Sequence, residues 1–173
     1  MTDKNLGRRE AAEIVRDVGG CIVGRTRLQK IAYLLELAGF GVGFRFEYRH
    51  FGPYCEELAE GMRAAQAFGL IEEEERPTEW GGFYSIYRSL PEVGEQIQDD
   101  RAVFASLAAQ IGAITLELVA TAAYLRDEVG YDDPWEETAR LKPEKSEGRL
   151  DQAKDAYRKL LELETPTRLP EIV

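Results

Sequence analysis

The residue types with the greatest chemical capacity lie together in one segment, RHFGPYCEEL, from Arg49 to Leu58. It holds His50, which is the single histidine of the chain, and Cys55, five residues further on. A cysteine can act as a nucleophile when a neighbouring imidazole accepts its proton. No glycine-rich oxyanion loop or orienting carboxylate is recognisable nearby. We therefore expect Cys55 to be a small buried residue at a helix start and His50 to be a core or rim residue.

The sequence contains few signals for a metal site or for another kind of catalytic site. One histidine and two cysteines cannot make a zinc-type ligand set or a disulfide framework. No phosphate loop, dinucleotide motif or nucleophile elbow is present. Glu56, Glu57 and Glu60 lie in the first turns of the expected third helix. Their negative charges complement the helix dipole there, which explains them better than a role in acid–base catalysis. The sequence thus predicts no catalytic residue, no metal, no cofactor and no enzymatic activity.

A basic set in the first third of the chain is the best candidate for binding. The chain carries a net charge of -10, yet residues 1–50 hold nine Lys and Arg against six Asp and Glu. The acidic total disfavours general nucleic-acid binding, although a local basic face could still bind DNA. An ordinary solvated face is the alternative. The candidate residues for binding a partner or nucleic acid are Arg25, Arg27, Lys30, Arg45, Arg49, His50 and Tyr54.

The elements that position these residues follow from hydrophobic periodicity. Helices are expected at 7–18, at 27–38 with Thr26 and Gln29 as a capping box, and from Pro53 to about residue 68. Residues 42–51 alternate like a half-buried strand that ends at Gly52 and Pro53. The run LIEEEE and the run FYSIYRS then predict a hairpin. Its aromatic residues, Trp80, Phe83, Tyr84 and Tyr87, are either core and hairpin tip or a partner contact.

The rest of the chain is expected to be helical. Apolar residues recur at spacings of three and four from Phe104 to Leu125, which is typical of a coiled-coil seam. The seam is one long helix or two helices broken near Gly112. If it stays exposed, it predicts a homodimer through residues 104–125. Asp133 is expected to cap a short helix, and a last helix precedes an extended strap or frayed tail.

These elements predict a mainly α fold with a small antiparallel β component. A winged-helix-like module at 1–90 is expected to carry a helical extension, 91–173, packed on it as one compact unit. The N-terminal residues are charged rather than apolar, and the seam is too polar to span a membrane. We therefore expect a soluble, cytoplasmic protein that does not insert into membranes.

The segments TRLQKIAYLLELAG and FEYRHFGPYCEELAEGMRAAQAFGLIEE resemble a bacterial family. The pattern is similar to that of YwgA-like proteins and of the related Panacea (SocA-type antitoxin) domain. Phe51 stands where that pattern has tyrosine. The family-signature residues are Leu28, Gln29, Lys30, Tyr33, Gly52, Pro53, Tyr54 and Leu58.

The resemblance implies a winged-helix-related fold without established chemistry. It also implies a regulatory, antitoxin- or adaptor-like protein that binds a protein partner, such as a toxin or a component of a protease system. The alternative hypothesis is a winged-helix transcriptional regulator that binds DNA through the basic face. A strand separates the second and third helices, so the direct-readout geometry of a DNA-binding unit is not predicted.

Overall fold

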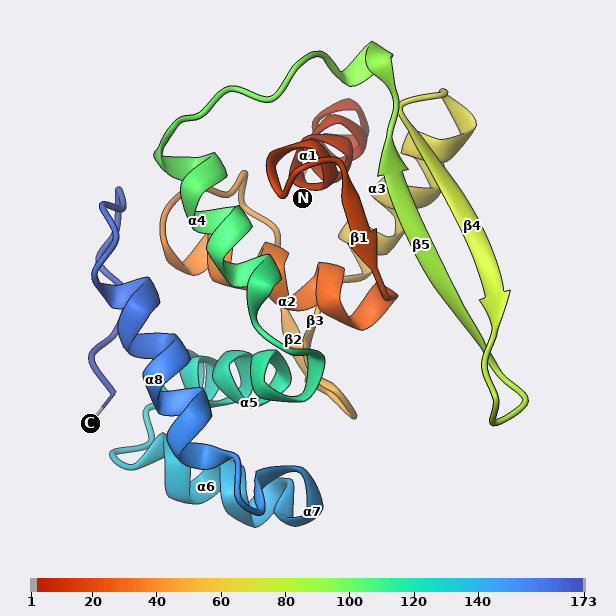
Figure 1. The fold of residues 1–173 in the computed structure, drawn as a ribbon. Helices are drawn as coiled ribbons and strands as arrows, with labels where there is room; N and C mark the ends of the chain where they lie inside the picture. Colours follow the sequence, from red (N-terminus) through yellow and green to blue (C-terminus); the bar gives the residue numbers. More distant parts are fainter. Residues whose placement is uncertain (1–2, 173) are drawn as a thin grey trace.

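The computed structural model describes residues 3–172 and is mainly helical (Figure 1). The predicted fold class, mainly α with a small antiparallel β component, is confirmed. Within these residues, no helix is long and apolar enough to cross a membrane. The helices are α1 (Lys4–Asp17), α2 (Arg25–Leu37), α3 (Glu56–Ala67), α4 (Asp100–Gln110), α5 (Ala113–Tyr124), α6 (Pro134–Leu141), α7 (Pro143–Ser146) and α8 (Leu150–Leu161), with a π-helical turn at Leu125–Val129.

The strands form two small antiparallel sheets. One sheet has the order β1–β5–β4, and the other is the hairpin β2–β3. The β4–β5 hairpin confirms the prediction, whereas β1 had no signal of its own. It becomes a strand by pairing with β5, so that Ile22 lies opposite Tyr87. The strands are β1 (Cys21–Val23), β2 (Glu47–Arg49), β3 (Gly52–Tyr54), β4 (Ile71–Pro77) and β5 (Phe83–Ser89).

Helix α2 lies at the centre of the hydrophobic core. Its residues Ile31, Leu34 and Leu35 are almost completely buried. The helix contacts α4, α5, β1 and β3. One cluster of buried side chains runs from Ala11 to Leu169, so the core is continuous across residue 90. The two segments expected from the sequence share this core.

The expected seam of residues 104–125 is divided between two helices. Helix α4 ends at Gln110, and α5 starts only after extended backbone at Ile111 and Gly112. Much of the seam is buried within the chain, including Phe104, Leu118, Thr121 and Leu125. Ile114 remains 40% exposed, and the homodimer expected through this segment stays a prediction.

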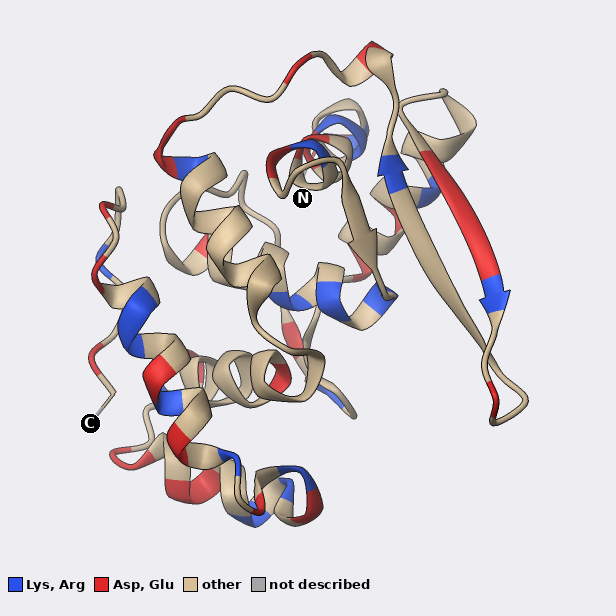
Figure 2. Ribbon diagram, in the orientation of Figure 1, with Lys and Arg blue, Asp and Glu red and all other residues tan. Residues whose placement is uncertain are grey.

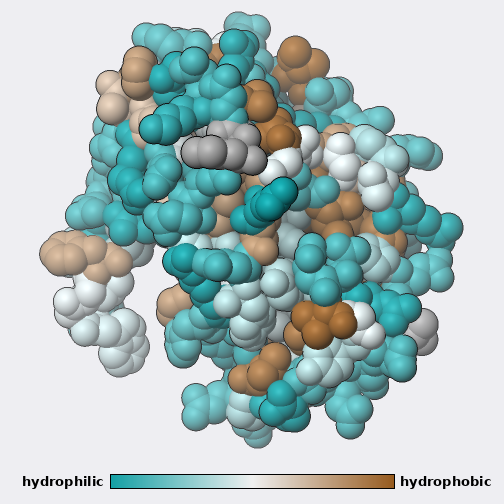
Figure 3. Space-filling model, turned by 180° about the vertical axis from the view of Figure 1, so that it is seen from behind, coloured by the Kyte–Doolittle hydropathy of each residue, from teal (hydrophilic) through white to brown (hydrophobic). Residues whose placement is uncertain are grey.

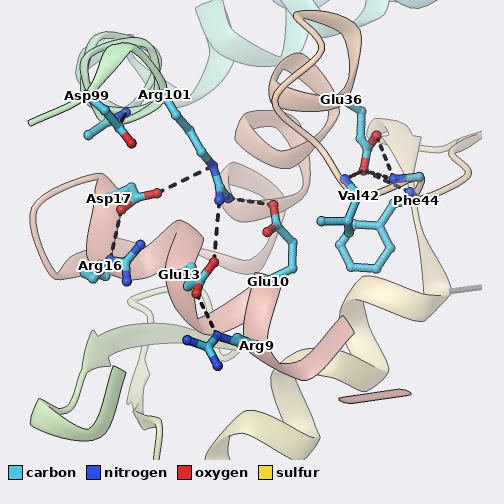
Figure 4. Close-up of polar contacts among 12 residues, drawn as sticks. Arg9, Glu10, Glu13, Arg16, Asp17, Glu36, Val42, Phe44, Asp99 and Arg101 are labelled. Carbon is cyan, nitrogen blue, oxygen red and sulfur yellow. Dashed lines mark hydrogen bonds and ion pairs between the residues drawn. The ribbon is translucent and has the colours of Figure 1, made fainter. Parts of the chain in front are cut away.

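The segment of residues 42–51 is mostly irregular rather than the expected strand, because 42–46 have no regular secondary structure and only Glu47–Arg49 form β2. The Glu36 carboxylate accepts hydrogen bonds from the backbone amides of Val42, Gly43 and Phe44 at 2.9–3.2 Å (Figure 4). These amides point at one side chain and are not available for a strand ladder. Strand pairing is therefore confined to residues 47–54.

The start of α3 also differs from the expectation. Pro53 does not enter the helix but belongs to β3, and Cys55 precedes the first helical residue. Gly52 has φ of 97°, which is in the region that favours glycine. A Cβ atom at Gly52 would also lie 2.9 Å from the Thr121 hydroxyl oxygen. The Gly-Pro pair thus turns the hairpin against α5 instead of starting a helix.

An arginine ties α4 to α1. The Arg101 guanidinium lies 2.5 Å from Glu10 Oε1, 3.7 Å from Glu13 Oε2 and 3.5 Å from Asp17 Oδ2 (Figure 4). Burial raises the pKa of the Glu10 carboxyl to about 7 although Arg101 opposes the shift. Burial likewise raises the pKa of Asp17. Arg101 is thus a shared counter-charge for these carboxylates, and Arg16 supplies a second one to Asp17 at 3.0 Å.

Helices α1 and α3 approach each other closely at Gly61. A Cβ atom there would lie 2.7 Å from the Gly7 carbonyl oxygen. We expect Gly61→Ala to lower the free energy of unfolding by about 1–3 kcal/mol, because the backbone must shift to relieve the clash. Urea denaturation checks this, with exposed Glu60→Ala in the same helix as the control. A Gly61→Ala protein as stable as wild type would contradict the close packing.

The segment after α8 returns to the core as an extended strap, which is the first of the two alternatives expected for it. Leu169 is buried, and the Thr167 amide donates to the Ala38 carbonyl at 3.0 Å. The Tyr157 hydroxyl donates to the Pro170 carbonyl at 2.5 Å. The strap thereby joins the end of α2 to α8.

Candidate functional site

A pocket of about 660 Å³ lies between α2, α3, the β2–β3 hairpin and the strands β4 and β5. It brings together two segments, 25–30 and 49–54, that are distant in the sequence. The signature residues Leu28, Gln29 and Gly52 line it as well. Five of the seven candidate binding residues line this pocket: Arg25, Lys30, Arg49, His50 and Tyr54.

The other two candidates lie outside the pocket. Arg27 donates from Nη1 to the carbonyl oxygens of Ala109 and Ile111, at 2.9 and 2.6 Å. These carbonyls end α4, so Arg27 has a capping role. Arg45 is exposed and makes no hydrogen bond or ion pair with any residue in the range 3–172.

The arginines at the pocket rim are already paired. Figure 2 shows the basic start of α2 and the acidic length of β4. Arg25 Nη2 lies 2.9 Å from Glu73 and 3.0 Å from Glu75. Ion pairs of an exposed arginine such as these contribute little stability. Carboxylates of β4 therefore neutralise much of the positive charge at this rim of the pocket.

Arg49 is held in a similar way on the opposite rim. Its guanidinium contacts Glu47 and lies 3.5 Å from Glu56. It also stacks over the Tyr54 ring, with 4.2 Å between the guanidinium carbon and the ring centroid. Stacking of this kind favours the planar cation. Arg49 and Tyr54 thus form one preorganised unit at the mouth of the pocket.

Lys30 lines the inner wall of the pocket and differs from the arginines. It is 2% exposed. Its Nζ donates to the Pro53 carbonyl at 2.7 Å and forms no ion pair with any carboxylate of the described residues. Burial lowers the pKa of Lys30 to about 8, because the surroundings disfavour the charged form. The site therefore contains a buried cation without a carboxylate partner.

A buried charge cluster lies behind the β2–β3 hairpin, and the sequence analysis missed it. The Glu117 carboxylate pairs with Lys142 Nζ at 2.7 Å and with Lys145 Nζ at 2.8 Å. Lys142 Nζ also donates to the His50 carbonyl at 3.1 Å. A signal was present, because a carboxylate in an otherwise apolar helix needs a partner. The identity of the partner depends on tertiary structure.

Gln29 has a structural role that differs from the expected capping box. Its side-chain amide donates to the Cys55 carbonyl at 3.0 Å, and its oxygen accepts from the Cys55 amide at 2.8 Å. Gly24, not Thr26, precedes the helix. The reciprocal pair fixes the start of α3 against α2. It therefore fixes the relative position of two walls of the pocket.

The remaining signature residues are part of the core. Leu58 is fully buried. The Tyr33 ring packs against Phe46 and Tyr124, with centroid distances of 5.3 and 5.9 Å. The signature thus includes residues that build the pocket as well as residues that line it.

His50 and Cys55 do not form a nucleophile pair. The imidazole is at the surface and packs edge-on against Phe51. Cys55 is buried, and burial raises the pKa of its thiol. A thiol of this kind is a poor nucleophile. In the part of the chain that the structure describes, no group of three or more His, Cys, Asp or Glu could hold a metal ion.

The aromatic residues of the β4–β5 hairpin are divided between the core and the surface. Tyr87 is buried, whereas Trp80 and Phe83 are 93% and 72% exposed. Figure 3 shows the hairpin projecting from the body of the molecule at the lower left. The hairpin tip is thus separate from the pocket.

Comparison with known proteins supports one part of the expected resemblance. No protein-family model matches the chain. The uncharacterized protein YwgA of Bacillus subtilis (strain 168) is 30% identical over 80 residues. The chain is similar to YwgA. The match covers 46% of this chain and 47% of YwgA, so the chain spans about half the length of the relative it matches. The name YwgA states no activity.

Proposed function

We propose that the chain is a non-enzymatic protein-interaction module, antitoxin- or adaptor-like, that binds a protein partner at the pocket. The partner would be a toxin or a component of a protease system. One observation carries this proposal: five of the seven residues selected from the sequence line a single pocket. The inert environment of Cys55 further supports a binding role over nucleophilic catalysis.

The order of the helices and strands supports a winged-helix-related fold. Apart from the β2–β3 hairpin, the order is α1–β1–α2–α3–β4–β5, with the sheet order β1–β5–β4. The hairpin lies between α2 and α3, where a DNA-binding unit has a tight turn. In this module it forms one wall of the pocket instead. We infer that the inserted hairpin adapts the fold to bind a protein.

DNA binding is the weaker alternative. Helix α3 begins with Glu56 and Glu57, and β4 carries four consecutive glutamates. These carboxylates would repel phosphates at the two elements that a winged helix brings to DNA. The pairing of Arg25 and Arg49 with carboxylates removes further free positive charge.

Site-specific cross-linking tests the proposed binding site. A photoreactive phenylalanine analogue replaces Phe51, which is 49% exposed at the pocket, and cross-linking is performed in the native host. The matched control carries the analogue at Trp80 on the projecting hairpin. We expect one protein partner to be captured from position 51, and captured at least tenfold less by an Arg49→Glu variant.

Two results would contradict this proposal. One is equal capture from positions 51 and 80, with no effect of Arg49→Glu. The other is a salt-dependent shift of duplex DNA at low micromolar protein that Arg49→Glu abolishes, which would favour the DNA-binding alternative. Arg45→Glu makes the same charge change outside the pocket and is expected to behave as wild type.

A further inference from the structure

We propose that the pocket binds an acidic peptide segment of the partner, and that a carboxylate of this segment pairs with Lys30. This inference rests on the proposed function and assigns the chemistry of the recognised group. Its starting point is the position of Lys30. The side chain is nearly inaccessible to solvent, lines the inner wall of the pocket and is held by one neutral acceptor, the Pro53 carbonyl.

The charges around Lys30 leave an excess of positive charge. Glu117 on α5 attracts Lys30, whereas Lys142, before α7, and Lys145, on α7, repel it. Glu117 is already engaged by both of these lysines. Three lysines therefore share one carboxylate, in a chain whose overall charge is strongly negative. An incoming carboxylate would supply the missing counter-charge.

The rest of the pocket wall indicates what surrounds that carboxylate. Leu28, Ala59 and Met62 give the wall an apolar part. The paired arginines at the rim carry N–H groups in a planar fork, and these can also donate to backbone carbonyl oxygens of a ligand. A ligand that fits has an acidic side chain flanked by apolar side chains. An extended peptide with a central glutamate and neighbouring leucines has this pattern.

The presence of a charged side chain at position 30, in surroundings that disfavour charge, supports a binding role for Lys30. A buried cation without a charged partner destabilises a fold, and replacement by an apolar residue of similar length is often tolerated. We therefore expect Lys30→Met to fold normally, with an unfolding midpoint equal to or above that of wild type. A residue that costs stability in the free protein is explained if it contributes to binding.

The test uses two matched peptides, acetyl-Leu-Glu-Leu-amide and acetyl-Leu-Gln-Leu-amide, titrated into the full chain. Backbone amide NMR signals of Gly52 and Cys55 report binding at the pocket. We expect the glutamate peptide to bind at least tenfold more tightly than the glutamine peptide. Lys30→Met should remove this difference, and Arg45→Gln, which removes an exposed charge outside the pocket, should preserve it.

The pH dependence provides a readout that needs no mutation. Since burial lowers the pKa of Lys30 to about 8, the free protein loses this charge above that pH. The affinity for the glutamate peptide should fall about tenfold per pH unit above 8, and that for the glutamine peptide should not. Equal binding of both peptides, or discrimination that persists in Lys30→Met, would overturn the inference. Either result leaves the cross-linking test of the proposed function intact, because that test does not depend on a carboxylate.

Discussion

Replacing Arg101 with methionine is expected to lower the free energy of unfolding by about 3–5 kcal/mol at pH 8. The guanidinium is the shared partner of Glu10, Glu13 and Asp17 and joins α4 to α1. Methionine keeps the apolar stem but leaves Glu10 and Asp17 buried without that charge. The loss exceeds that expected for a surface pair because these carboxylates cannot regain full hydration. Urea denaturation monitored by circular dichroism measures it.

The pH dependence distinguishes lost charge from lost packing. The pKa of Glu10 is raised from 4.5 to about 7 in the folded protein. Its protonated form therefore contributes stability that is fully present below pH 4.5 and is lost as the pH rises through 7. The cost of Arg101→Met should accordingly shrink between pH 8 and pH 5, as the carboxyls take up protons. An equal loss at both pH values would point to packing instead.

A matched control for this variant is available in the same cluster. Arg9 pairs with Glu13 across one helical turn at 3.0 Å, and its side chain is 76% exposed. Arg9→Met should therefore change the free energy of unfolding by less than about 1 kcal/mol. A loss as large as that of Arg101→Met would show that burial does not decide these effects.

Replacing Glu117 with glutamine should also lower the free energy of unfolding by about 3–5 kcal/mol. Its carboxylate is the counter-charge for Lys142, which is nearly as deeply buried. Without it, Lys30, Lys142 and Lys145 would repel each other behind the β2–β3 hairpin. The attraction of Glu117 also raises the pKa of Lys30, so its loss should lower that pKa further. Thermal and urea unfolding check the stability change.

A double-mutant cycle isolates the pair. Glu117→Gln combined with Lys142→Met removes both charges, so the double variant should be less destabilised than the sum of the single variants by at least 1 kcal/mol. Asp155→Asn, which breaks an exposed pair with Arg158, serves as the surface control. Additive effects in the cycle would contradict a direct coupling between Glu117 and Lys142.

The elements with strong local signals could be predicted from the sequence. Helices at the periodic segments, the β4–β5 hairpin and the short helix capped by Asp133 all form, although α2 and α3 start at other residues than expected. The prediction of a strand at 42–51 was wrong over its first half, because a side chain six to eight residues earlier overrides the strand signal of the alternation. Glu36 binds three of its backbone amides, and nothing in the local pattern shows this.

The candidate site could be predicted only in part, because contacts that the local sequence does not show also decide which residues lie together. The sequence selected the basic residues of the first third but could not show which share a surface. Arg25 and Arg27 are two positions apart on a helix and therefore point to different sides. Arg25 lines the pocket, and Arg27 instead contacts the end of α4. The Glu117 cluster joins α5 to Lys142, between α6 and α7, and to Lys145 on α7, so only the tertiary structure could assemble it.

The central position of α2 affects the order in which the protein can fold during its own synthesis. The helix is made early, yet α4, α5 and the strap that hydrogen-bonds to Ala38 through Thr167 leave the ribosome much later. Until then the apolar surface of α2 that packs against α4 and α5 has no cover. A nascent chain paused after residue 90 would expose that side to other chains or to chaperones. Slow translation through the second half of the chain should therefore promote aggregation more than the same delay in the first half.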